Sequence, residues 1–295
     1  MVKIIFIFLF GIIQSQNFSY SDDDWFILTS PNHINSITYN DDEILISSDN
    51  GVFSYNRFDK EFYYRNDLLQ KLDDKNIKIV HYDSFKEHIW LVNRNALYFK
   101  SSISDFWREI DFFSDLGVSN SNMILNIGSD PDGIYIETYN KIFWLDGYNG
   151  KLIKSYQNKM LLDKYVYWSG TMKGDYNDSI DLMSYFFISE WNISNNSTLE
   201  YKGRNVQITC LKKIDNKFII VGTDSGEMFR CNIHSKKIKK IKSIPPINNM
   251  HIAYLDKENE WWIADNDLKN FDRTYYYDRE IIFLVKWNLN NNKWV

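Results

Sequence analysis

The sequence has little glycine and little proline, the two residues that most often make turns. Only 12 Gly and 4 Pro stand among 295 residues, whereas there are 32 Asn. Asn and Asp accept the left-handed backbone conformation and also hydrogen-bond to their own backbone, so they can replace glycine in turns. We therefore expect Asn and Asp to make most of the turns.

The chain also lacks an excess of basic charge. Its 34 Lys and Arg and 39 Asp and Glu leave a net charge of −5, and its pI is about 5.6. This balance excludes a dedicated nucleic-acid-binding protein, which needs a basic face to neutralise phosphates. Hydrophobic residues make up 44% of the chain and charged residues 25%, so we expect a globular domain rather than a disordered one.

Cysteine is scarce, with only Cys210 and Cys231 present. The strand pattern described below places them on the first and third strands of one sheet. Neighbouring strands lie ~4.8 Å apart, which would separate the two residues by about 9.5 Å. Because a disulfide needs Cα atoms closer than about 7 Å, we expect two separate, buried thiols.

Long apolar runs are missing except at the N-terminus, where Lys3 precedes the run Ile4–Ile13. This run is too short to span a bilayer, which needs about 20 residues. We predict that residues 1–15 are a cleaved export signal, although an N-terminal anchor or a buried strand would also fit. We expect no membrane span in the mature chain. The protein should be periplasmic or extracellular and, because its composition is rich in Asn, Lys and Ile, bacterial.

Self-similarity is the most informative feature of residues 16–295. Similar apolar strands begin at residues 34, 77, 124, 206 and 247, and the one long gap predicts a degenerate copy near 165. Each copy continues with a polar turn, a second strand, a tight turn, a third strand and a more polar fourth strand. A period of about 40–45 residues with four strands is typical of a β-propeller blade. The sequence thus predicts an all-β propeller domain over residues 16–295.

The number of blades is open between six and seven. The segment Asp24–Thr29 resembles a further outer strand before the first copy, while Lys293–Val295 already supplies a fourth strand to the last one. The segment Lys236–Lys242 alternates lysine with isoleucine. It predicts an outer edge strand that lysines protect from aggregation, with a contact to nucleic acid or membrane as the alternative.

The repeats resemble those of periplasmic two-component-regulator propellers and, more loosely, the WD-type and quinoprotein-like propellers. The turns Asp130–Gly133 and Gly222–Gly226 match the family pattern best, and Trp25 and Thr29 fit the strand that precedes its first unit. The family glycine is replaced at Asn95-Ala96 and at Asn140-Lys141. The resemblance implies a propeller fold and a sensor role, and it brings no fixed catalytic residues.

A search for chemistry gives no catalytic, metal-binding or cofactor-binding motif, so we predict no cofactor and no metal. His81 and His251 fall at equivalent positions of two first strands. Both would face the central channel, where they could bind a ligand or be hydrogen-bonded parts of the core.

The second candidate site is the insertion 266–279 in the last unit. It carries Tyr275, Tyr276 and Tyr277 between Arg273 and Arg279. Tyrosine and arginine are enriched in binding hot spots, and loops on rigid scaffolds often bind ligands. The alternative is an elongated hairpin whose tyrosines pack on the rim.

These observations predict an exported, non-catalytic β-propeller that binds a protein, a carbohydrate or another small ligand through loops on one face. Two other functions are open. One is a propeller enzyme that acts on polysaccharide, and the other is the sensor fragment of a two-component regulator.

Overall fold

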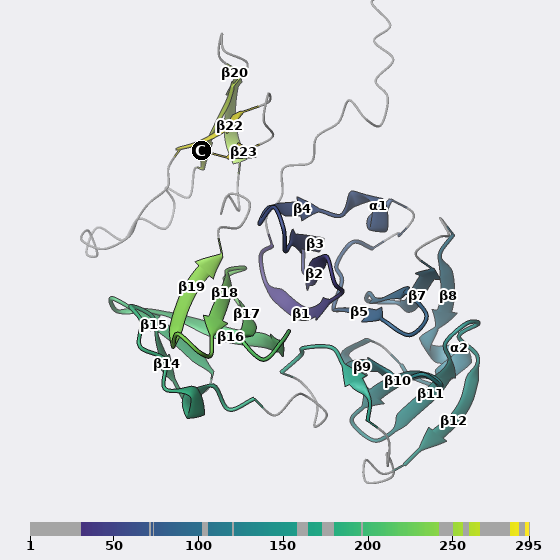
Figure 1. The fold of residues 1–295 in the computed structure, drawn as a ribbon. Coiled ribbons are helices and arrows are strands. Elements are labelled where there is room, and N and C mark those ends of the chain that lie inside the picture. Colours follow the sequence, from purple (N-terminus) through teal and green to yellow (C-terminus); the bar gives the residue numbers. More distant parts are fainter. Residues whose placement is uncertain are drawn as a thin grey trace, which may run out of the picture.

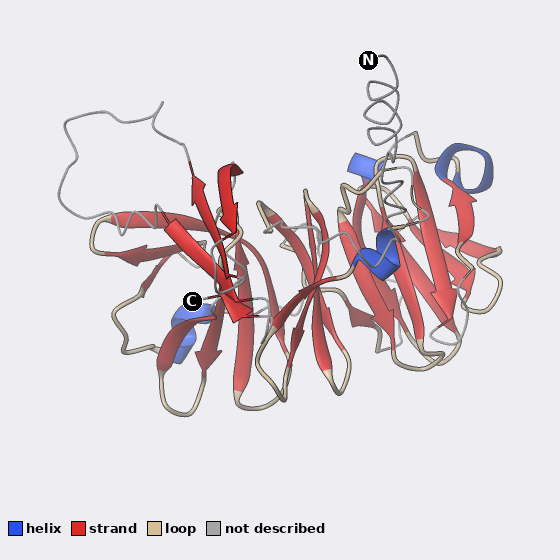
Figure 2. Cartoon of the chain, turned by 90° about the horizontal axis from the view of Figure 1, so that it is seen from above, coloured by secondary structure: helices blue, strands red, loops and turns tan. Residues whose placement is uncertain are grey.

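The computed structural model describes residues 31–70, 72, 74–101, 106–119, 121–157, 165–172, 180–195, 197–241, 250–255, 260–265, 284–288 and 293–294. Within these residues the chain forms five antiparallel sheets and a few short helices (Figures 1 and 2). This confirms the all-β class that the repeats predict. The described residues contain no helix that is long and apolar enough to cross a membrane.

Three of the sheets contain four strands that follow one another in chain order, as the repeat predicts. The first sheet comprises β1 (Ile34–Tyr39), β2 (Glu43–Ser48), β3 (Gly51–Asn56) and β4 (Phe62–Tyr64). The second comprises β5 (Ile79–Asp83), β6 (His88–Val92), β7 (Ala96–Ser101) and β8 (Arg108–Asp111). The last comprises β20 (Met250–Leu255), β21 (Glu260–Asp265), β22 (Leu284–Asn288) and β23 (Lys293–Trp294).

The other two sheets share the segment predicted to be the degenerate fourth blade. The third sheet comprises β9 (Ile124–Ser129), β10 (Gly133–Thr138), β11 (Ile142–Asp146) and β12 (Leu152–Tyr156), with β13 (Tyr167–Trp168) added beside β9. The fourth comprises the four strands of one repeat copy, β16 (Arg204–Lys213), β17 (Phe218–Thr223), β18 (Met228–Asn232) and β19 (Lys237–Ile241), with β14 (Asn192–Ser194) and β15 (Thr198–Tyr201) added beside β16. The described residues of the unit near 165 therefore extend two neighbouring sheets and form no four-stranded sheet of their own.

Short helices connect the sheets at the ends of strands (Figure 2). They are α1 (Asn66–Leu69), α2 (Phe112–Leu116), η2 (Ser121–Met123) and η4 (Leu182–Tyr185).

The first four sheets lie around a common centre, and β1 contacts both β5 and β16 there (Figure 1). The hydrophobic core fills the seams between neighbouring sheets. Ile37 packs in one cluster with Ile220, Leu45 in a second with Leu91, and Trp90 in a third with Ile136. Strands in such seams are covered on both faces, which explains their nearly continuous apolar sequences.

Polar side chains organise almost every hairpin turn. A side-chain oxygen at the start of the turn accepts a hydrogen bond from a backbone N–H two to four residues later. The residues are Asn40, Asp83, Asp130 and Asp215 between first and second strands, Ser48, Asn93, Thr138 and Thr223 between second and third, and Asn56, Asp146 and Asn232 between third and fourth. Asn and Asp thus replace glycine mainly through these side-chain bonds.

The two cysteines are free and buried, Cys210 on β16 and Cys231 on β18. Burial raises the pKa of each thiol to about 12. The prediction of two separate thiols is confirmed.

Candidate functional site

The centre of the four sheets is occupied by the segment 168–171, which we call the central segment. It runs on from β13 and bonds to every surrounding sheet. Gly170 N–H donates to Ile37 O (2.7 Å), Ser169 N–H to Ile127 O (2.8 Å), and Lys212 Nζ to Trp168 O (2.7 Å). These contacts satisfy buried polar groups at the place where the sequence predicts an axial channel.

His81 lies beside the central segment on β5, only 2% exposed. The Ser169 hydroxyl donates to Val80 O (3.1 Å), so it accepts from His81 Nδ1 (2.9 Å). The other ring nitrogen, Nε2, then accepts from the Ser129 hydroxyl (2.9 Å). Burial and the nearby charge of Lys212 lower the pKa of His81 to about 3, so the ring is neutral at ordinary pH.

A hydroxyl that donates a hydrogen bond to a neutral imidazole is arranged like a serine nucleophile beside its histidine base. Ser129, however, is fully buried, as is His81. The arrangement therefore holds β5, β9 and the central segment together and does not present a nucleophile to solvent. His81 matches the structural alternative of the sequence analysis.

His251 does not occupy the position that His81 occupies. In β1, β16 and β20 the pairing with the second strand shifts by one residue, and the bulged residues are Asn35, Thr209 and His251. The pairing in β5 is regular, with His81 opposite Trp90. The equivalence predicted from the sequence is therefore wrong in register. The third residue of β6, Trp90, pairs with His81, whereas the third residue of β21, Trp262, pairs with Tyr254, so His251 lies three residues before the equivalent position.

The remaining predicted residues, Arg273, Tyr275, Tyr276, Tyr277 and Arg279, lie outside the described part of the chain. Their role in binding stays a prediction.

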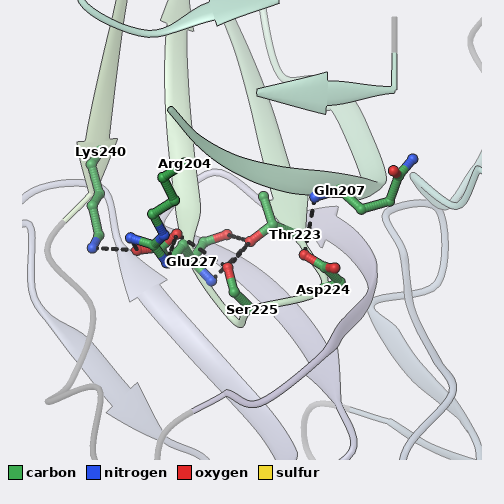
Figure 3. A network of polar contacts seen from close by, with 7 residues as sticks. All are labelled: Arg204, Gln207, Thr223, Asp224, Ser225, Glu227 and Lys240. Atoms are coloured by element: carbon green, nitrogen blue, oxygen red, sulfur yellow. Dashed lines mark hydrogen bonds and ion pairs between the residues drawn. The ribbon is translucent and has the colours of Figure 1, made fainter. Parts of the chain in front are cut away.

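A polar network occupies the end of the fourth sheet on the face that carries the turns between second and third strands (Figure 3). Arg204 donates two hydrogen bonds of 3.0 Å to the buried carboxylate of Glu227, and Lys240 donates one of 2.6 Å. Burial alone would raise the pKa of Glu227, but the hydrogen bond and charge of Lys240 and the charge of Arg204 outweigh it and lower the pKa. Both cations bind the same carboxylate, so the network clamps β16 to β19.

The turn within this network is also closed locally. Thr223 Oγ1 donates to Glu227 O (2.9 Å), Ser225 Oγ donates to the Glu227 carboxylate (3.1 Å), and the Asp224 carboxylate accepts from Gln207 N–H (3.1 Å) (Figure 3). We assign this network to stability.

The opposite face, which carries the turns between first and second strands, has a group of exposed aromatic side chains. Phe85 and Tyr167 have ring centroids 5.7 Å apart, and Tyr165 and Tyr167 are 4.9 Å apart and perpendicular. Their side chains are 40%, 46% and 75% exposed for Phe85, Tyr167 and Tyr165. We call these three residues the aromatic cluster.

Lys86 and Tyr148 flank the aromatic cluster across the seam between the second and third sheets. Lys86 Nζ donates to Pro131 O (3.0 Å) and lies 5.5 Å from the Tyr148 ring, which is largely exposed. His88 bonds to Gly147 O through Nδ1 (2.9 Å) and contacts the edge of Tyr148. Three turns and β13 thus hold aromatic and cationic groups at one rigid seam.

The sequence predicts a degenerate repeat copy near residue 165, without marking any of its side chains as a binding site. The alternation of residues 165–168 is the signal that could have identified the exposed tyrosines, because Val166 and Trp168 are buried while Tyr165 and Tyr167 are exposed. The nearness of Phe85 comes from the packing of two sheets, which no local pattern shows.

In the part of the chain that the structure describes, no three His, Cys, Asp or Glu side chains are grouped as a metal site would require.

Comparisons with known proteins give matches at the level of structure only. No model of a protein family matches the sequence, and no curated protein matches it. The chain is similar to the extracellular domain of a putative hybrid two-component system from B. thetaiotaomicron, at 15% identity and a TM-score of 0.33 over 90% of this chain and 30% of that one.

Two further solved structures are also similar. One is the extracellular domain of a putative one-component system from B. thetaiotaomicron, at 16% identity and a TM-score of 0.32 over 89% of this chain and 27% of that one. The other is a catalytically inactive virginiamycin B lyase from Staphylococcus aureus, at 14% identity and a TM-score of 0.35 over 91% of this chain and 85% of that one. The chain spans less than a third of the length of the two extracellular domains.

Proposed function

We propose that this chain is an exported, non-catalytic β-propeller that binds a protein or a small ligand through exposed side chains on one face. The observation that carries the proposal is the aromatic cluster. Phe85, Tyr165 and Tyr167 expose large apolar rings, although burying such rings is what normally stabilises a fold. Rings held in place by their neighbours can bind a ligand with little loss of side-chain entropy.

The chemistry of the aromatic cluster favours a saccharide among these ligands. Tyrosine offers an apolar ring face and a hydroxyl on the same side chain, and the faces of sugar rings offer C–H groups bordered by hydroxyls. Lys86 adds a hydrogen-bond donor at the same seam. A protein segment is the other ligand class, and the experiment below separates the two.

The sensor role that the repeat resemblance implies would use the same surface. The polysaccharide-degrading alternative would require a reactive group near the aromatic cluster, and the buried Ser129–His81 pair does not supply one.

The test is affinity electrophoresis of the full chain in gels that contain a soluble β-glucan, xylan, mannan or pectin. We expect at least one polysaccharide to retard the chain. Tyr165→Ala and Tyr167→Ala should each weaken this retardation about 30-fold, which corresponds to the loss of ~2 kcal/mol that defines a binding hot spot.

Tyr139→Ala is the matched control, because the exposure of Tyr139 lies between those of Tyr167 and Tyr165 but the residue is in the β10–β11 turn on the other face. If Tyr139→Ala reduces the retardation as much as Tyr165→Ala does, the proposal is contradicted. Mobility unchanged by every polysaccharide would exclude the saccharide and leave a protein ligand. Release of reducing ends from a retained polysaccharide would show catalysis.

A further inference from the structure

A second exposed surface lies on the outer rim of the fourth sheet, where η4 and the segment after it meet β19. Phe186 and Ile188 are each 79% exposed, and Met183 is about half exposed. Lys237 and Lys239 are exposed on β19, and Lys236 is partly exposed in the preceding turn. We call these six residues the rim patch.

Hydrogen bonds fix the backbone around Phe186 in a defined turn. Asp181 accepts from Met183 N–H (3.1 Å), and Phe186 N–H donates to Met183 O (3.2 Å). Phe186 itself has left-handed dihedral angles (φ 50°, ψ 58°), an unfavourable conformation for a bulky side chain. The turn therefore holds an apolar ring outward at a conformational cost, and such strain tends to be kept where it serves a function.

The lysines lie beside this segment because the chain runs along β19. Ile188 N–H donates to Lys236 O (2.6 Å), and Ser189 Oγ donates to Ile238 O (2.9 Å). This segment covers part of the edge of β19, so protection of a bare edge explains the lysines only in part. Exposed carboxylates of the same segment are Asp181 and Glu190, fewer than the lysines of β19 and its turn.

We propose that the rim patch docks on the surface of an anionic membrane. Protruding apolar side chains beside a row of lysines match the boundary between acyl chains and phosphate headgroups, which accepts them without a shaped pocket. Lysine stems can lie along the apolar zone while their ammonium groups contact phosphates. An acidic protein would instead need a cavity that fits Phe186 and Ile188 separately, so the observations favour the membrane.

The test uses a spin label at position 188 in the full chain. Ile188→Cys introduces the one reactive thiol, because Cys210 and Cys231 are buried and their thiols resist deprotonation. Ile153→Cys is the matched control, since Ile153 is a half-exposed isoleucine on β12. The readout is the access of a water-soluble relaxation agent to the label, with vesicles of phosphatidylcholine and phosphatidylglycerol in equal parts or of phosphatidylcholine alone.

We expect the anionic vesicles to shield the label at position 188 and not the label at position 153. The variant Lys237→Gln/Lys239→Gln should raise the lipid concentration for half shielding about 25-fold, at about fivefold for each lysine. Lys151→Gln/Lys154→Gln, which removes two exposed lysines from β12 and its preceding turn, should leave it unchanged.

Three results would overturn the proposal. They are equal shielding at positions 188 and 153, equal shielding by neutral and anionic vesicles, or equal effects of the two lysine pairs. Shielding at position 188 by soluble polyglutamate and not by vesicles would also overturn it and assign the rim patch to an acidic protein.

Discussion

At the scale of single residues, His81 illustrates how a chemically attractive side chain can serve the fold. Its ring bonds two serine hydroxyls from different elements and is closed off from solvent. The sequence shows a histidine on a first strand but not the partners that other repeats bring to it. Only the arrangement of the sheets shows whether such a histidine can bind a ligand or is a hydrogen-bonded part of the core.

The neutral state of His81 makes stability depend on pH. The pKa of the folded state, about 3, lies below the ordinary value of 6.5, so the unfolded state binds a proton first as the pH falls. The contribution to stability is full above pH 6.5 and is lost progressively below it. Between about pH 6.5 and pH 4.5 this one group should lower the free energy of unfolding by about 2–3 kcal/mol.

The variant His81→Gln removes this titration, while its amide can still donate to one hydroxyl and accept from the other. Urea unfolding of both proteins across this pH range should show a smaller loss in the variant, by about 2–3 kcal/mol. Parallel pH curves for the two proteins would contradict the role assigned to His81.

The positions of left-handed turn residues also differ from what the sequence predicts. The abundance of Asn predicts left-handed turn residues, yet Asn195 is the one Asn with positive φ among the described residues. Lys60, Glu87, Lys202 and Lys236 also have positive φ. The Asn and Asp side chains begin the turns instead, and the left-handed positions follow where the hairpin geometry requires them.

At the scale of elements, the turn between β17 and β18 depends on one glycine. Gly226 has φ +74°, and a Cβ at this position would lie 1.6 Å from Pro31 O at the entry to the first sheet. Gly203 has a similar φ of +80° in the β15–β16 turn, but nothing lies within 4 Å of its would-be Cβ. Alanine at Gly203 would therefore cause backbone strain alone, whereas alanine at Gly226 would cause backbone strain and a clash between sheets.

We expect Gly203→Ala to lower the free energy of unfolding by about 1 kcal/mol, the usual cost of a left-handed alanine. Gly226→Ala should lower it by at least about 2 kcal/mol, because the turn must also move away from Pro31. Urea unfolding midpoints would measure both effects. Equal losses in the two variants would show that the contact between the turn and Pro31 contributes nothing.

The strands were the most predictable elements. The polar fourth strand that the sequence predicts in each copy forms at Leu152–Tyr156 and at Lys237–Ile241, because alternation and turn chemistry are local signals. In the degenerate copy the strand Thr198–Tyr201 forms, but it pairs with β16 and extends the fourth sheet. The sheet that a strand joins depends on the strand with which it pairs, and the sequence of the degenerate unit does not predict that pairing.

At the scale of the whole molecule, the repeat organisation predicts sheets around an axis. The structure fills that axis with the central segment and leaves exposed aromatic residues at a seam on one face. The number of blades, six or seven, stays a prediction. So does the binding loop that carries Arg273 and Tyr275–Tyr277, and we propose the aromatic cluster as the ligand site instead.

Hydroxyl-radical footprinting tests this claim most directly, because it reports the exposure of each aromatic side chain of the full chain. It would be carried out with and without the polysaccharide that retards the chain most. Binding at the aromatic cluster predicts protection of Phe85, Tyr165 and Tyr167, with Tyr139 unchanged. Protection confined to Tyr275–Tyr277 would contradict binding at the aromatic cluster and would favour the loop predicted from the sequence.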